Sequence, residues 1–86
     1  MEKSLFSSDY AAFLEQLKEA RKKANLTQEQ VAERLGQTQS FVSKVERGER
    51  RLDVVELRAF CKALEISFTS FITRFDKILT ARQVKR

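Results

Sequence analysis

Residues 26–48 read LTQEQVAERLGQTQSFVSKVERG, and this stretch decides the fold. Thr27, with Gln30 three residues later, matches a capping box and predicts that a helix begins there. Gly36 ends that helix, because glycine reaches a positive φ without a steric cost. Thr38 then caps a second short helix that extends to about Arg47. The sequence therefore predicts two short helices joined by a tight turn.

The apolar residues of this stretch fit two helices that cross at a steep angle. A small residue is needed where they approach closely, and Ala32 supplies it. Val42 and Val45 provide the branched side chains that the second helix buries, and together with Gly36 they have the spacing of a helix-turn-helix. Because the two valines face inward, four polar residues of the second helix project outward: Gln39, Ser40, Ser43 and Lys44.

The flanking sequence predicts three more helices, so the expected fold class is all-α with five helices. The 86 residues include no proline and only two glycines, which favours helix throughout. Apolar residues at helical spacing predict helices over residues 9–24, 53–64 and 67–80. We divide the chain into an N-terminal extension (1–8), a compact helix-turn-helix and dimerisation domain (9–80) and a basic C-terminal tail (81–86).

The charge pattern indicates a polyanionic partner. The sequence carries 17 Lys and Arg against 12 Asp and Glu, a net charge of +5, and many of the cations lie between Arg21 and Arg51. No apolar run approaches the ~20 residues of a membrane span. The N-terminus also lacks the continuous apolar stretch of a signal peptide. We therefore expect a cytoplasmic protein without membrane contact.

Several kinds of site do not fit this sequence. It contains no histidine and one cysteine, Cys61, which lies among apolar residues and is expected to be buried. A His/Cys zinc site and a histidine-based triad are thereby excluded. The two glycines are isolated, so there is no glycine-rich phosphate loop. We expect neither an enzyme nor a cofactor.

Three segments resemble the lambda-repressor-like family of Xre/Cro-type transcriptional regulators. Residues 26–36 resemble the first half of the family's motif, residues 40–49 resemble its second half, and residues 63–67 resemble the end of its fourth helix. The resemblance covers roughly residues 13–75. It implies a five-helix domain whose third helix lies in the major groove of double-stranded DNA, and hence a sequence-specific DNA-binding regulator.

The resemblance also assigns roles to polar residues. Gln28 matches a glutamine that bonds a DNA phosphate, although it could be an ordinary helix-start residue. The outward set of the second helix matches positions that touch base edges or nearby backbone, with a solvated face as the alternative; its members are Gln39, Ser40, Ser43 and Lys44. Three arginines follow that helix and are interpreted as phosphate contacts or, alternatively, as solvated loop charges: Arg47, Arg50 and Arg51.

Two further positions concern the frame of the domain. Arg21 and Glu46 match a basic and an acidic residue that pair in the family, bracing the first helix against the third, so a structural ion pair is favoured over a DNA contact. Phe41 departs from the family, in which this position is often polar. It could touch a thymine methyl, or lean back onto the second helix or the loop before the fourth. The sequence leaves both possibilities open.

The last predicted helix is more apolar than one face of a small domain requires. It can pack on the first helix, and it can also form a two-fold interface with a second copy; we predict both. A dimer would place two recognition helices about 34 Å apart on a pseudo-palindromic operator. The predicted interface residues are Phe68, Phe71, Ile72, Phe75, Ile78 and Leu79.

Another class of function remains open from the sequence. The domain could be an antitoxin whose apolar helix or tail binds a toxin, or the controller protein of a restriction-modification system. Neighbouring genes would discriminate between these alternatives, and the sequence itself identifies no protein partner beyond a second copy.

Overall fold

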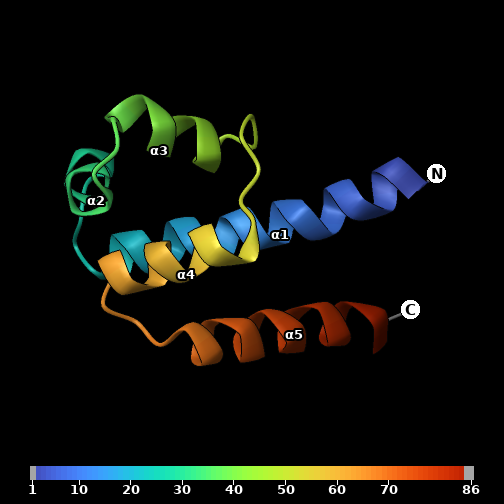
Figure 1. Ribbon diagram of the computed structural model, residues 1–86. Coiled ribbons are helices and arrows are strands. Elements are labelled where there is room, and N and C mark those ends of the chain that lie inside the picture. The colour runs from blue at the N-terminus through green and yellow to red at the C-terminus, as the bar shows by residue number, and fades with distance from the viewer. Residues whose placement is uncertain (1, 85–86) are drawn as a thin grey trace.

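The computed structural model describes the backbone of residues 2–84 and the side chains of residues 8–82. Within these residues, the fold is all-α, as predicted, and Figure 1 shows α1 and α4 lying between α3 and α5. None of the described helices is long and apolar enough to cross a membrane. The five helices are α1 (Glu2–Lys23), α2 (Gln28–Leu35), α3 (Gln39–Glu46), α4 (Val54–Ala63) and α5 (Phe68–Val84).

The predicted capping residues begin the helices. The backbone N–H of Gln30 donates to Oγ1 of Thr27 at 3.1 Å, and the backbone N–H of Thr27 donates to Oε1 of Gln30 at 2.9 Å. Asp53 and Glu56 form an equivalent capping box at α4. Gly36 follows α2 with φ of 68°, so the turn to α3 has the left-handed conformation that the sequence predicts.

The two ends of the chain differ from expectation. α1 begins at Glu2 rather than near Asp9, and α5 continues to Val84 rather than ending near residue 80. Residues 2–8 of the N-terminal extension and residues 81–84 of the C-terminal tail are therefore helical. The two helices contact each other near these ends, because Arg82 donates to the hydroxyl of Ser8 and lies 4.0 Å from the Asp9 carboxylate. Residues 1, 85 and 86 lie outside the described residues.

The core joins α1, the helix-turn-helix and the two C-terminal helices. Its fully buried side chains include Leu17, Val31, Val42, Val45 and Cys61. Ala32 is also buried, so the inward frame predicted for α2 and α3 is confirmed. This frame holds α3 at the surface of the domain with one face against the core.

Phe71, one of the residues predicted to form a dimer interface, is buried within the domain. Its side chain is 4% exposed, and its ring meets Phe13 edge-on at a centroid distance of 6.0 Å. The ring of Phe75 also meets Phe13, at a centroid distance of 5.8 Å, but Phe75 is only partly buried. The ring of Phe71 therefore belongs to the core of one chain, because α5 turns this position toward α1.

Val54 departs from the buried apolar face of α4. It lies three residues before the buried Leu57, at the spacing of the inward stripe, but its side chain is 62% exposed. The neighbouring Val55 is 74% exposed. The reason is that Val54 is the first residue of α4 and lines an open groove with Ile72.

Candidate nucleic-acid interface

α3 presents a polar face on the opposite side from its buried valines. Gln39, Ser40 and Lys44 are exposed, while Ser43 is partly buried. Figure 1 shows this helix at the edge of the molecule, remote from α5. Because α3 has eight residues and only its inner side contacts the core, its outer side is free to approach a flat or grooved partner.

An ion pair holds α3 against α1. Nε of Arg21 lies 2.6 Å from Oε2 of Glu46, and Nη2 of Arg21 lies 3.1 Å from Oε1 of Glu46. The side chains are 13% and 4% exposed, respectively. Arg21 also donates to the carbonyl of Leu26, at 2.9 Å. The predicted structural pair is thus present, and its bidentate geometry fixes the C-terminal end of α3 against α1.

Two glutamines extend this network to the start of α3. Nε2 of Gln28 donates to Oε1 of Glu46 at 2.9 Å, and Nε2 of Gln39 donates to Oε1 of Gln28 at 3.3 Å. The amide of Gln28 is therefore held at both ends, although each atom retains further hydrogen-bonding capacity. Since Gln39 uses one amide proton here, its Oε1 and second proton remain available to a binding partner.

Arg47 is held on the polar side of α3. Its guanidinium donates to the hydroxyl of Ser43, one turn earlier, and forms two hydrogen bonds with Glu49 at 3.0 and 3.1 Å. The hydrogen bonds from Arg47 lower the pKa of Glu49 below its usual range. Ser43 therefore accepts an intramolecular hydrogen bond, while its own hydroxyl proton can still be donated to another partner.

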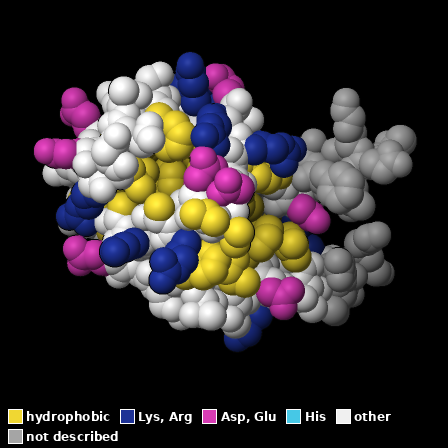
Figure 2. Space-filling model, in the orientation of Figure 1, with side chains coloured by type: hydrophobic (Ala, Val, Ile, Leu, Met, Phe, Trp, Pro, Cys, Tyr) yellow, Lys and Arg dark blue, Asp and Glu magenta, His cyan; other side chains and the backbone are white. Residues whose placement is uncertain are grey.

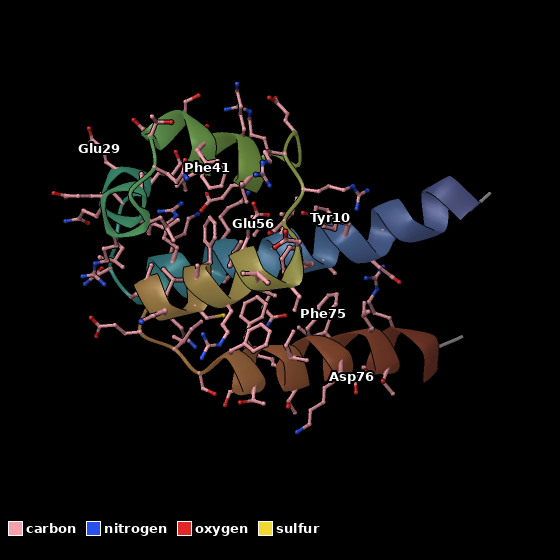
Figure 3. The ribbon with its side chains drawn as sticks, viewed as in Figure 1. Tyr10, Glu29, Phe41, Glu56, Phe75 and Asp76 are labelled. Carbon is pink, nitrogen blue, oxygen red and sulfur yellow. The ribbon has the colours of Figure 1, made fainter. Side chains whose placement is uncertain are left out.

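Phe41 leans back toward α4 and the loop that precedes it. Its ring centroid lies 6.4 Å from that of Phe60, and the guanidinium carbon of Arg50 lies 5.1 Å from the Phe41 centroid. Figure 3 shows Phe41 directed from α3 toward the interior. Of the two possibilities left open by the sequence, the structure favours the packing role.

The two arginines of the loop between α3 and α4 are both engaged. Arg50 forms a bidentate pair with Glu56, at 2.9 and 2.8 Å. The guanidinium carbon of Arg51 lies 4.3 Å from the ring centroid of Tyr10, whose hydroxyl accepts from the backbone N–H of Leu52 at 3.1 Å. Sequence reasoning missed Tyr10 as a loop anchor, because this contact joins residues about forty positions apart. Phosphate contacts by Arg50 and Arg51 stay predictions.

The Arg50–Glu56 pair has a measurable electrostatic signature. The hydrogen bonds from Arg50 lower the pKa of Glu56, and the backbone N–H of Asp53 lowers it further. We expect Arg50→Gln to raise the pKa of Glu56 toward the ordinary range, as measured by an NMR titration of the side-chain carboxyl. Glu49, whose pKa is lowered by Arg47, should titrate unchanged in this variant. An unchanged Glu56 pKa would show that the pair does not persist in solution.

Comparison with known proteins assigns the family. The family model described as helix-turn-helix matches residues 17–71. The chain belongs to the XRE-like helix-turn-helix family, and the resemblance identified from the sequence is confirmed.

Individual relatives agree with this assignment. An uncharacterized HTH-type transcriptional regulator, y4dJ, of Sinorhizobium fredii is 37% identical over 57 residues, covering 66% of this chain and 74% of the relative. An XRE-family like protein from Pseudomonas syringae pv. tomato is 40% identical, with a TM-score of 0.85 over 90% of this chain and 94% of that one. The restriction-modification controller protein C.AhdI from Aeromonas hydrophila is 33% identical, with a TM-score of 0.67 over 74% of this chain and 93% of that one.

Proposed function

We propose that this protein is a sequence-specific DNA-binding transcriptional regulator that reads the major groove with α3. The observation that carries the proposal is the fixed outward face of α3, whose first residue is aligned by the network from Arg21 through Glu46 and Gln28. A recognition helix must be held rigidly, because base edges are distinguished by the direction of their donors and acceptors. Membership of the helix-turn-helix family and the naming of y4dJ as a transcriptional regulator support the same function.

The chemistry of this face fits duplex DNA. Gln39 can bond adenine through two hydrogen bonds, and Lys44 can donate to guanine. Ser40 and Ser43 can serve bases or phosphates. Around α3, Arg47 and the loop arginines would contact phosphates after exchanging intramolecular partners, whereas Gln28 would use the hydrogen-bonding capacity that it retains beside Glu46 and Gln39.

An apolar surface supports binding as a homodimer. The α4–α5 surface comprises Val54, Ile72, Phe75 and Leu79, which line a groove of about 440 Å³ together with Leu52 and Leu57. Figure 2 shows hydrophobic side chains gathered over α4 and along its seam with α5. Ile72 of α5 is 38% exposed, so both helices contribute exposed apolar side chains to this surface. A two-fold contact between two such surfaces would bury them and pair two copies of α3.

The proposed interface thus differs from the set expected from α5 alone. It omits Phe71 and gains the first turn of α4 at Val54. Five members of the expected set have partly or well exposed side chains: Phe68, Ile72, Phe75, Ile78 and Leu79.

Selection of bound sequences from a random DNA pool tests the proposed function. A dimer should enrich two inverted half-sites whose centres lie about 10–10.5 base pairs apart, or a multiple of this distance. Binding of the selected site should weaken steeply with salt, because neutralised phosphates release counterions. Failure to enrich any common sequence would contradict sequence-specific recognition, and enrichment of single half-sites alone would contradict the dimer.

Lys44 provides a prediction about base recognition. We expect Lys44→Ala to reduce discrimination at one base position in each half-site by about 10-fold, because one base-specific donor is lost. Binding to single-base variants of the selected site measures this effect. Lys62→Ala, which removes an exposed cation of α4, is the matched control and should leave the base preference intact. A uniform loss over all sequences would identify Lys44 as a phosphate contact instead.

A second candidate function is control of a restriction-modification system. It is favoured by the similarity to C.AhdI, which spans 93% of that controller protein. Adjacent genes for a DNA methyltransferase and an endonuclease, with the selected site in their promoter, would support it. The mode of DNA binding would be the same, and the regulated genes would differ.

A further inference from the structure

A groove of about 710 Å³ lies away from both α3 and the α4–α5 surface. It is formed where the end of α1 meets the loop after α4 and the beginning of α5, at the opposite end of α5 from the C-terminus (Figure 1). This volume is within the range of small-molecule sites, about 300–1,000 Å³. Its apolar wall consists of Ala20, Leu64, Ile66 and Phe71.

Gln16, a lining residue of this groove, carries a buried hydrogen-bond acceptor that has no partner. The side chain lines the groove and is 7% exposed. Its Nε2 donates to the carbonyl of Phe71 at 3.0 Å, which sets the orientation of the amide. Its Oε1 is the one buried side-chain polar atom among the described residues that has no hydrogen-bond partner. An acceptor buried in this way is costly unless a donor reaches it.

Positive charge surrounds the same groove. Lys22 and Lys23 come from the last turn of α1, and Arg74 comes from the second turn of α5. None of the three forms an ion pair within the described part of the chain, and one carboxylate, Glu19, accompanies them in the lining. The hydroxyls of Ser67 and Ser70 add further polar groups at the start of α5. The groove therefore combines an apolar wall, an unpaired acceptor and an excess of cations.

We propose that this groove binds a small organic anion that has an apolar body and an N–H or O–H donor. The donor would satisfy Oε1 of Gln16, the apolar body would cover Leu64 and Ile66, and the anionic group would pair with Arg74. A neutral apolar molecule would make no ionic contact with the cations. An inorganic anion would leave the apolar side chains of the groove exposed to water. The site is separate from the DNA-binding face, so it stands or falls independently of the proposed function.

Indole-3-acetate is a suitable probe, because its ring, ring N–H and carboxylate supply the three required groups. In an NMR titration of the full chain, it should give saturable shifts at the amides of Gln16, Ala20 and Ser70, with a dissociation constant of about 1 mM or lower. 1-Methylindole-3-acetate lacks the donor and indole-3-acetamide lacks the charge. Each should bind at least about fivefold more weakly, because a charged or buried hydrogen bond is lost.

Two variants test the protein side of the contact. Arg74→Gln should lower the affinity for indole-3-acetate at least about fivefold, because the charge contact is removed. Its affinity for indole-3-acetamide should not change. Arg58→Gln, at an exposed cation of α4 outside the groove, should bind both like the unmodified protein. Absence of saturable shifts at these amides, or equal binding of the probe and both analogues, would overturn the proposal. So would equal effects of the two arginine variants.

Discussion

Glu46→Ala should strongly lower the thermal stability of the protein in the absence of DNA. The substitution leaves Arg21 with 13% side-chain exposure and no carboxylate partner, and it removes the acceptor of Gln28. Breaking a buried pair from one side costs about 3–5 kcal/mol. For a domain of this size, each kcal/mol corresponds to roughly 4–8 °C in Tm, so the expected decrease exceeds about 10 °C. Circular dichroism melting measures it directly.

Glu49→Ala is the matched control, because it also removes a carboxylate from an arginine pair. The Arg47–Glu49 pair has side-chain exposures of 53% and 55%, and exposed pairs contribute little to stability. We expect its Tm to remain close to that of the unmodified protein. Glu46→Gln, which keeps a hydrogen-bonding side chain but removes the charge, should fall between the two. Equal melting of the Glu46→Ala and Glu49→Ala proteins would exclude a bracing role for Arg21–Glu46.

Val54→Asp should convert the proposed dimer to a monomer with weak operator binding. The substitution places a charge in the α4–α5 surface, whereas an aspartate in the first turn of a helix is compatible with its dipole, so folding should be preserved. Without the second recognition helix, operator affinity should fall by about 100-fold or more. Analytical ultracentrifugation and titration of the selected operator measure the two effects.

Two companion variants make this result interpretable. Ile72→Asp alters the same surface from α5 and should reproduce the effect, while Thr73→Asp adds the same charge at the next exposed position of that helix, outside the groove. The Thr73→Asp protein should remain dimeric and bind the operator normally. Tight operator binding by a monomeric Val54→Asp protein would refute the link between dimerisation and recognition, and dimers of both interface variants would place the interface elsewhere.

Local signals explain why much of the fold could be predicted. Thr27 with Gln30 and Asp53 with Glu56 satisfy backbone N–H groups within a few residues, so their effect is visible in a short stretch of sequence. The start of α1 could not be found in this way. Ser8 and Asp9 are typical capping residues, but here they lie inside the helix and face Arg82 of α5. A local pattern does not reveal a partner more than seventy positions away.

The candidate site shows the same limit. The outward face of α3 follows from helical spacing once Val42 and Val45 are known to be buried. By contrast, the contacts of Phe41 with Phe60 and of Arg51 with Tyr10 depend on how separate helices pack. The burial of Phe71 could not be foreseen for a related reason, since an apolar face does not reveal which of its members another helix will cover.

Cys61 offers a way to follow transient opening of this fold without introducing a label. It is the sole thiol in the sequence and is 1% exposed, and burial raises its pKa. Because a thiolate must be formed and reached before a reagent can react, modification requires α4 to separate from the core. The alkylation rate therefore reports how often the native packing opens, and its slowing by DNA would measure how far binding suppresses those fluctuations.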